Sequence, residues 1–214
     1  MVEIRTPEPR DLEAFYAISL ATGDFGRDAG DLYRDAHLMG FIYSAPYAVL
    51  TPQTCLVAQD DDGVGGYVVG VHDTRGFEAR LEQEWWPDLR RRYAEPAGDP
   101  AGWTPDERRH HRLHHPLITP AAVLADYPAH VHLNLLPRMQ GQGLGRKLLA
   151  AWMALMCPEK RLGVHAGLNP NNPGAMAFWP ACGFVPLDPV PGGDLANLAN
   201  PFWHGRFMGP SEGR

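Results

Sequence analysis

The stretch LNLLPRMQGQGLGRKLL, residues 133–149, carries the pattern that decides the fold. Its apolar start, which ends at Pro137, predicts a strand, and the apolar spacing after Gly145 predicts a helix. Glycines at positions 141, 143 and 145 lie between the two, where the lack of a side chain lets a ligand approach the backbone. The free N–H groups of a first helical turn bind anions, and the helix dipole strengthens this attraction. The stretch therefore predicts a strand–turn–helix unit that binds a phosphate-bearing ligand.

The spacing of this turn excludes two other kinds of phosphate-binding motif. A Walker A loop needs Ser or Thr after its lysine, whereas Leu148 follows Lys147. A dinucleotide fingerprint needs a third glycine where this chain has Arg146. Residues 140–145 instead read Q-x-x-G-x-G, and Arg138 adds positive charge together with Arg146 and Lys147. We interpret the turn as a pyrophosphate site, and a purely structural turn is the alternative.

The rest of the chain predicts an α/β protein. In the C-terminal part, strands are expected at 129–136, 162–168, 184–187 and 202–208, with helices at 143–156 and 174–182. In the N-terminal part, we expect a strand at 2–5, a helix that begins at Asp11, a second helix around 31–40, and strands at 55–59 and 66–72. The Asp/Gly-rich link between the last two strands indicates a hairpin. Alternating strands and helices imply a partly parallel sheet.

Residues 75–128 differ in composition from the segments on both sides, because they are rich in charged side chains and tryptophan. Two helices are expected there, at 77–93 and 104–115, with a Pro/Gly linker at 95–102. Thr104 and Glu107 form a capping-box pattern around a proline at the first helical position. The segment has too few aliphatic residues for a core of its own. We therefore expect a single domain over residues 1–214, with a helical insertion at 75–128.

Composition excludes several classes of protein. With 214 residues, 44% of them hydrophobic and 21% charged, the chain has the composition of a globular domain. A formal net charge of −6 argues against a nucleic-acid partner. The three cysteines form no C-x-x-C pair, which fits a reducing compartment. Neither a leader pattern nor a membrane-length apolar run is found, so we expect a cytoplasmic protein without a membrane partner. The oligomeric state stays open.

The glycine turn after a strand resembles the acetyl-CoA signature of the GNAT acetyltransferases. Residues 172–184 read N-x-x-A-x-x-F-W-x-x-x-G-F, which is similar to a second motif of this family. The stretch YPAHVHLNLLP, residues 127–137, the insertion and the hairpin more narrowly resemble the acetyltransferase-like C-terminal domain of O-GlcNAcase and its free-standing bacterial homologues. The resemblance implies a GNAT fold, which is a mixed, splayed sheet with helices on both faces. It also implies transfer of an acetyl group from acetyl-CoA to a small-molecule amine or a peptide.

The resemblance further implies roles for individual residues in holding acetyl-CoA. The backbone of Leu135 and Leu136 would pair with the pantetheine arm like an added strand. Asn172 would hydrogen-bond the pantetheine, and Ala175 and Phe178 would line the far side of the cofactor. The pyrophosphate would be held by Gln140, Gly141, Gln142, Gly143, Leu144 and Gly145, with Arg146 beside it. The residues themselves leave an alternative open: Asn172 is also typical of a helix cap, and Ala175 and Phe178 are typical of a helix core.

The catalytic residues are where the chain departs from the family pattern. The tyrosine that commonly serves as the general acid is replaced by Trp179, whose indole N–H donates a hydrogen bond but does not release a proton near neutral pH. Two function classes therefore stay open. One is a working N-acetyltransferase, and the other is a weak or inactive pseudo-acetyltransferase that binds CoA or a peptide.

The general base is also not the family's usual one, since residues 129–136 contain no Asp or Glu. Strand alternation places His130, His132 and Asn134 on one face, and histidine has a pKa suited to accepting a proton. We predict His132 as the base, with Asp126 as the rival. The alternative is that His132 is hydrogen-bonded within the sheet.

Four further histidines lie on the second predicted helix of the insertion. His110 and His114, like His111 and His115, are four residues apart, which is a spacing that binds metals. No acidic or cysteine third ligand is near in the sequence, so no metal is expected. We interpret the four histidines as a polar rim over the acceptor groove.

Overall fold

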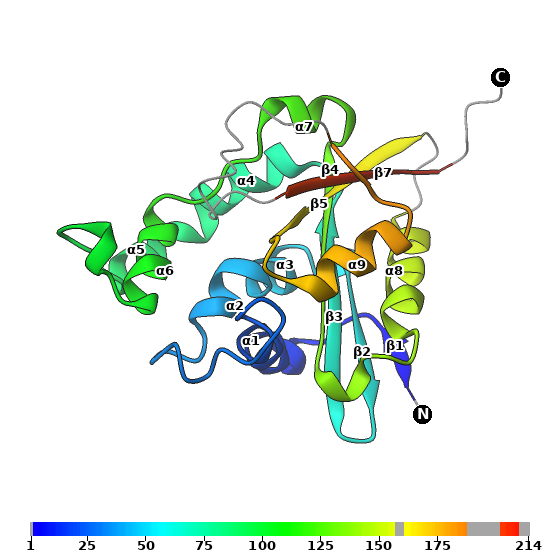
Figure 1. The fold of residues 1–214 in the computed structure, drawn as a ribbon, viewed down its shortest axis with the longest axis horizontal. Coiled ribbons are helices and arrows are strands. Elements are labelled where there is room, and N and C mark those ends of the chain that lie inside the picture. The colour runs from blue at the N-terminus through cyan, green and yellow to red at the C-terminus, as the bar shows by residue number, and fades with distance from the viewer. Residues whose placement is uncertain (1, 157–160, 188–201, 210–214) are drawn as a thin grey trace.

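The computed structural model describes residues 2–156, 161–187 and 202–209. At its centre is a sheet of seven strands in the order β1-β2-β3-β4-β5-β7-β6 (Figure 1). Among the described strands, β4 and β5 run parallel and every other neighbouring pair is antiparallel. This mixed sheet confirms the predicted α/β class. The strands are β1 (Glu3–Arg5), β2 (Cys55–Asp60), β3 (Gly63–Val71), β4 (Ala129–Leu135), β5 (Leu162–Leu168), β6 (Val185–Pro186) and β7 (Phe202–Met208).

Helices cover both faces of the sheet, as expected. Side chains of β3 alternate between two buried apolar clusters, with Val69 and Val71 in one and Val68 in the other. The first cluster contains the helices that precede β2 and the insertion, and the second contains α8 and α9. The helices are α1 (Leu12–Ala21), α2 (Leu38–Tyr43), α3 (Ala45–Leu50), α4 (Thr74–Glu84), α5 (Trp86–Arg92), α6 (Pro105–His114), α7 (Ala121–Asp126), α8 (Leu144–Leu155) and α9 (Pro173–Ala181). None of them is long and apolar enough to cross a membrane.

The sheet splays between β4 and β5. These strands pair only at their first residues, Ala129 with Val164 and His130 with His165. Beyond this point β5 continues to pair with β7 over its whole length, while the remainder of β4 pairs only with β3. In Figure 1, β7 accordingly crosses the direction of β3. The splay leaves one edge of β4, over residues 131–135, without a neighbouring strand.

The insertion leaves the sheet after β3 and returns to β4, which is the antiparallel neighbour of β3. At its base, the backbone N–H of Thr74 donates to the carbonyl of Pro128 at 2.9 Å. Its buried side chains, among them Phe77, Trp86 and Leu113, belong to the same cluster as those of α1–α3. The insertion therefore extends the core of the N-terminal half and has no separate core among the described residues.

The helix predicted around residues 31–40 is wrong in its position, since α2 begins at Leu38. Side chains of Asp28 and Asp35 accept the backbone N–H groups of Gly30 and His37, at 2.8 Å each. Such Asx turns compete with helix formation because they satisfy the backbone locally. The single helix predicted at 77–93 is also interrupted, at Trp85, because Pro87 lies in the first turn of α5, where its missing N–H is tolerated.

Candidate active site

A groove of about 900 Å³ lies beside the free edge of β4. It is lined by β4, by the glycine turn that begins α8, by the first half of α9 and by the loop that follows α1, residues 22–27. The sequence motifs predicted the first three of these segments. The loop after α1 carries no motif, and its place in the groove is set by tertiary contacts, such as the hydrogen bond from Asn134 Nδ2 to Thr22 Oγ1 at 2.6 Å.

The backbone conformation explains why glycine is found at two of these positions. Gly141 and Gly143 have φ angles of +74° and +72°, which side chains other than hydrogen strongly disfavour. A Cβ atom at either position would meet nothing within 4 Å, so the turn faces open space. Gly143 caps α8, and its carbonyl accepts the N–H of Lys147 at 3.2 Å. The N–H groups of residues 144–146 precede this first helical hydrogen bond and are available to an anion.

Gly145 differs from its two neighbours in what surrounds it. A Cβ atom there would lie 3.0 Å from Cε2 of Phe178, which is closer than most such contacts, so glycine favours the close packing of α8 against α9. Gly145 also lines the groove. Phe178 lines the groove as well and packs against the second core cluster.

The basic side chains near the turn are not equivalent. Arg146 lines the groove. Arg138 instead forms an ion pair with Asp60 at 3.1 Å and is held by the hairpin. Arg27, from the loop after α1, also lines the groove, although no sequence pattern connects it with Arg146.

The free edge of β4 ends before Leu136. The backbone N–H of Leu136 donates to Gly65 at 2.8 Å and its carbonyl accepts from Met139 at 2.9 Å, so its backbone is already paired. Leu135 lines the groove, and its carbonyl accepts a hydrogen bond from the side chain of Gln140 at 2.8 Å. This bond ties the turn to the strand. Gln142 and Leu136 are not among the residues that line the groove in the described part of the chain.

The start of α9 forms the opposite wall. Asn172 Oδ1 accepts the N–H of Ala175 at 2.9 Å, so Asn172 caps the helix, and its side chain also lines the groove. Trp179 lines the groove one turn further on, where its ring packs edge-on against Phe184 with centroids 4.7 Å apart. The described residues offer no hydrogen-bond acceptor to its indole N–H. Trp179 therefore brings an N–H donor, but no titratable group, to the groove.

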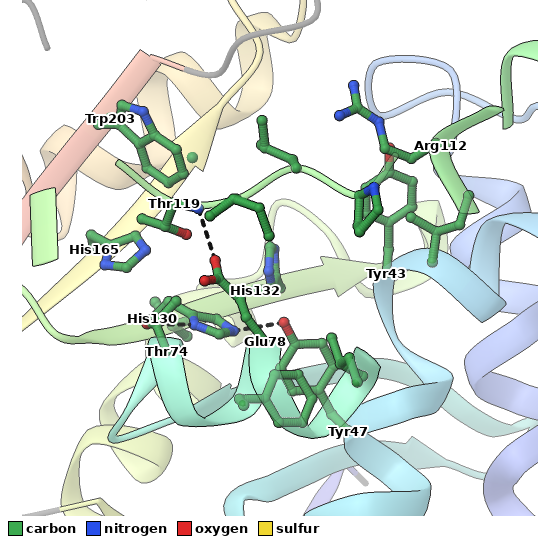
Figure 2. A pocket seen from close by; sticks show the side chains of 18 of the residues that line it. Tyr43, Tyr47, Thr74, Glu78, Arg112, Thr119, His130, His132, His165 and Trp203 are labelled. Carbon is green, nitrogen blue, oxygen red and sulfur yellow. Dashed lines mark hydrogen bonds between the residues drawn. The ribbon is translucent and has the colours of Figure 1, made fainter. Parts of the chain in front are cut away.

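The groove continues between β4 and β5 toward the insertion. A second cavity shares Asn134 and Trp179 with the groove, and it shares Arg112 and His132 with a third cavity under the insertion. Figure 2 shows this third cavity, which is lined by α3, α4, β4 and β5 and by the segment before α7. The three cavities thus adjoin one another in a series, which we call the path, and His132 lines both the second and the third.

His130 is fully hydrogen-bonded within the fold. The hydroxyl of Thr74 donates to the carbonyl of Pro128 at 2.6 Å, so it accepts from Nδ1 of His130 at 2.8 Å. Nε2 of His130 then accepts from the hydroxyl of Tyr47 at 2.6 Å (Figure 2). Burial, with smaller effects of His132 and His165, holds the pKa of His130 well below its usual value. His130 is a neutral, structural histidine.

His132 lies on the same face of β4 but has no hydrogen-bond partner among the described residues. Its half-buried ring packs edge-on against Tyr47 and His130, with centroids 5.7 and 5.5 Å apart. Burial, assisted by the nearby His165, lowers the pKa of His132 to about 4. At neutral pH the ring is therefore uncharged and has a nitrogen lone pair available.

The rival base is not at this site. Asp126 is exposed at the end of α7 and lines none of the cavities described above. A carboxylate that the sequence did not indicate, Glu78 of α4, lines the same cavity as His132. It accepts the backbone N–H of Thr119 at 2.8 Å (Figure 2) and forms an ion pair with Arg75. Both its oxygens are thus engaged in holding the insertion together.

Comparison with known proteins identifies the fold family. The chain superimposes on the crystal structure of SsHAT with a TM-score of 0.77 and 32% sequence identity, covering 96% of this chain and 98% of that one. The chain belongs to the GNAT acetyltransferase superfamily. An N-acetyltransferase from Staphylococcus aureus Mu50 shares the GNAT fold at 14% identity, with a TM-score of 0.56 over 96% of this chain and 100% of that one. No protein-family model matches the sequence.

Among curated proteins, this GNAT chain is 22% identical to protein O-GlcNAcase of Rattus norvegicus and of Mus musculus. Each match extends over 185 residues, which is 84% of this chain and 20% of the relative. The chain thus spans about a fifth of the length of these relatives. The likeness to acetyltransferases supports an acyltransferase activity for this GNAT protein.

Proposed function

We propose that this chain is an acetyl-CoA-dependent N-acetyltransferase that acts on a small-molecule amine or a peptide. The observation that carries the proposal is the path of adjoining cavities between the glycine turn and His132, a histidine without a hydrogen-bond partner among the described residues. The family makes acetyl transfer the expected chemistry, and the path supplies a place for each reactant.

Residues of the groove fit acetyl-CoA, which supplies an acetyl thioester when it is bound. The turn at Gly141 and Gly143, with the free N–H groups at the start of α8, would bind the pyrophosphate, with Arg146 and Arg27 beside it. The unpaired edge of β4, residues 133–135, would hydrogen-bond the pantetheine arm like an added strand. On the other wall, the pantetheine would contact Asn172, Ala175 and Phe178.

His132 would act as the general base. A base with a pKa of about 4 does not deprotonate an ammonium ion, so the acceptor must react as the neutral amine. The amine nitrogen becomes strongly acidic as it bonds to the acyl carbon, and the lone pair of His132 would then accept its proton. Because His132 lines both the second and the third cavity, the acceptor would bind under the insertion.

A second function is favoured by one specific observation, which is Trp179. Its indole lines the groove at the position of the family's usual acid, and indole supplies no proton for the departing thiolate. A chain of this kind would hold CoA or a peptide with little or no turnover. Both functions require that the groove binds CoA, and they differ only in whether an acetyl group is then transferred.

Product detection separates the two functions. The full chain is incubated with acetyl-CoA and a mixed panel of amines, amino acids and peptides, and acetylated products are identified by mass spectrometry. Acceptor-specific products, absent without protein, support the enzyme. Calorimetric binding of acetyl-CoA without any product supports the binding protein. A chain that binds no acetyl-CoA would contradict both.

A further inference from the structure

Three side chains of types that bind metals meet in the insertion, and none of them has a role in the proposed acetyl transfer. They are Glu95, from the segment after α5, and His111 and His115, from α6 and the residue that caps it. One ligand atom from each residue lies within 4.8 Å of the other two. The four-residue spacing of His111 and His115 suits metal binding. The third side chain, Glu95, lies 16 residues before His111 in the sequence.

Contacts outside the cluster hold the two segments together. The ring of His114 hydrogen-bonds the carbonyl of Tyr93 through Nε2 at 2.8 Å, and Arg90 Nε donates to the carbonyl of Leu113 at 2.9 Å. These bonds join the end of α5 to the end of α6. The approach of Glu95 to the histidines is therefore built into the packing of the insertion, and it does not depend on the ion pair between Glu95 and His115.

One nitrogen of the cluster lacks a partner. Nδ1 of His111 is a buried polar atom without a hydrogen bond in the described structure, and it lies 3.9 Å from Oε1 of Glu95. The rings of Trp103 and His115 both pack against His111, with centroids 4.9 and 4.3 Å away. Buried polar atoms are nearly always satisfied, so an unpartnered nitrogen that faces a carboxylate indicates a position for a cation.

The donor set suits a metal. Two histidines and a carboxylate are a donor set that zinc uses where a fourth position is left to water.

We propose that Glu95, His111 and His115 bind one zinc ion. The ion would bridge the segment after α5 to α6 and would satisfy the buried nitrogen of His111. His111 and Trp103 also line the second cavity, so the site lies at the wall of the path to the acetyl-transfer site. Zinc binding would thus stiffen the part of the insertion that the acceptor passes.

Calorimetric titration of the chelator-treated full chain with zinc chloride tests the proposal. We expect one zinc ion per chain and, with cobalt(II) in place of zinc, the intense visible absorption of a four-coordinate site. Glu95→Gln and His111→Ala should each weaken zinc binding at least as much as the roughly 10–100-fold that loss of an outer partner of a metal ligand costs. His110→Ala is the matched control, because His110 lies on the same helix but packs against Tyr93.

Several outcomes would overturn the site. The proposal would be refuted if the wild-type chain bound no stoichiometric zinc. It would also be refuted if the wild type, Glu95→Gln and His111→Ala bound zinc equally well, because zinc would then bind at other histidines. Circular dichroism shows whether each variant is folded, and Glu95→Gln, a change of an exposed side chain, decides the matter if His111→Ala does not fold. Acetyl-CoA binding is measured separately, so failure of the zinc site leaves the proposed acetyl transfer untouched.

Discussion

The groove and the cavity under the insertion, the two ends of one path, are built in different ways. The groove uses backbone: free N–H groups, two left-handed glycines and an unpaired strand edge, nearly all within residues 133–146 and 172–179. The cavity uses side chains that come from elements spread between residues 42 and 203. Backbone features are encoded locally, whereas a side-chain pocket exists only after distant elements have packed. A sequence therefore reveals the groove more readily than it reveals the cavity.

The same contrast is found within a single strand. His130 and His132 are two residues apart on one face of β4, and both are uncharged at neutral pH. Thr74 and Tyr47 occupy both ring nitrogens of His130, and no described residue does so for His132. The same residue type therefore has a structural role at position 130, whereas at position 132 it keeps a nitrogen lone pair available.

The largest expected effect is on catalysis at His132. His132→Gln keeps a side chain of similar size but removes the proton acceptor, so turnover should fall by about 10²–10⁴-fold, the usual contribution of a positioned base. Acetyl-CoA affinity should stay unchanged, because His132 does not line the groove. Single-turnover kinetics and calorimetry measure the two quantities. The exposed His72 provides the control, His72→Gln. Unaltered turnover in a folded His132→Gln chain would refute the assignment.

The next effect tests the backbone end of the path. Gly143→Asp introduces a side chain at a positive φ and a negative charge where a pyrophosphate would bind, so it should abolish acetyl-CoA binding. For the wild type, ligand at about 100 times its Kd should add about 2.7 kcal/mol to the free energy of unfolding, which a melting curve detects. Gly98→Asp has the same kind of backbone strain, at φ +82°, in the insertion. A thermal shift that survives in Gly143→Asp would place the cofactor elsewhere.

Trp179→Tyr should have a smaller and opposite effect, because it restores a phenol at the position of the usual acid. We expect acetyl-CoA binding to be retained. The rate of any acetyl transfer should increase by a factor near the lower end of the roughly 10²–10⁴-fold contribution of a positioned proton donor. The buried ring also loses volume, so a modest fall in stability should accompany it. Trp179→Phe separates the phenol from the change of size. A fall in robust turnover in the Tyr variant would mean that the indole itself takes part.

The smallest expected effect is a dependence of stability on pH through His165, which is buried in the cavity wall. Burial lowers the pKa of His165 to about 4, from about 6.5 in an unfolded chain. The unfolded state therefore binds more protons, and the stability that His165 contributes is complete above about pH 6.5 and is lost as the pH falls toward 4. The loss amounts to at most about 1.4 kcal/mol per pH unit.

Urea unfolding between about pH 7 and pH 5 measures this slope. The free energy of unfolding of His165→Gln should depend less steeply on pH than that of the wild type, by up to about 1.4 kcal/mol per pH unit. The substitution is also expected to lower stability at every pH. The exposed His72 again serves as the control, in His72→Gln. An identical slope in His165→Gln and the wild type would show that His165 takes no part in the acid sensitivity of the fold.

Elements whose signals are local could be predicted from the amino-acid sequence. The strands predicted at 162–168 and 202–208 match β5 and β7, and the glycine turn begins α8 as expected. The helix at 31–40 failed because aspartate side chains hydrogen-bond the backbone there, which apolar periodicity does not register. Glycine spacing indicated the turn, but it did not reveal that Gly145 packs closely against Phe178 while Gly143 has a positive φ.

Contacts between side chains that are distant in the sequence could be identified only from the folded structure. Nothing in the spacing of Glu78, Arg27 or Glu95 marks them, yet the first lies in the cavity of His132, the second in the groove and the third beside two histidines. Likewise, the splay of β4 from β5, which frees the strand edge, is evident only from the way the two strands pair in the folded sheet. Distances between residues far apart in the chain depend on how both pack against a shared core, and no local pattern encodes that packing.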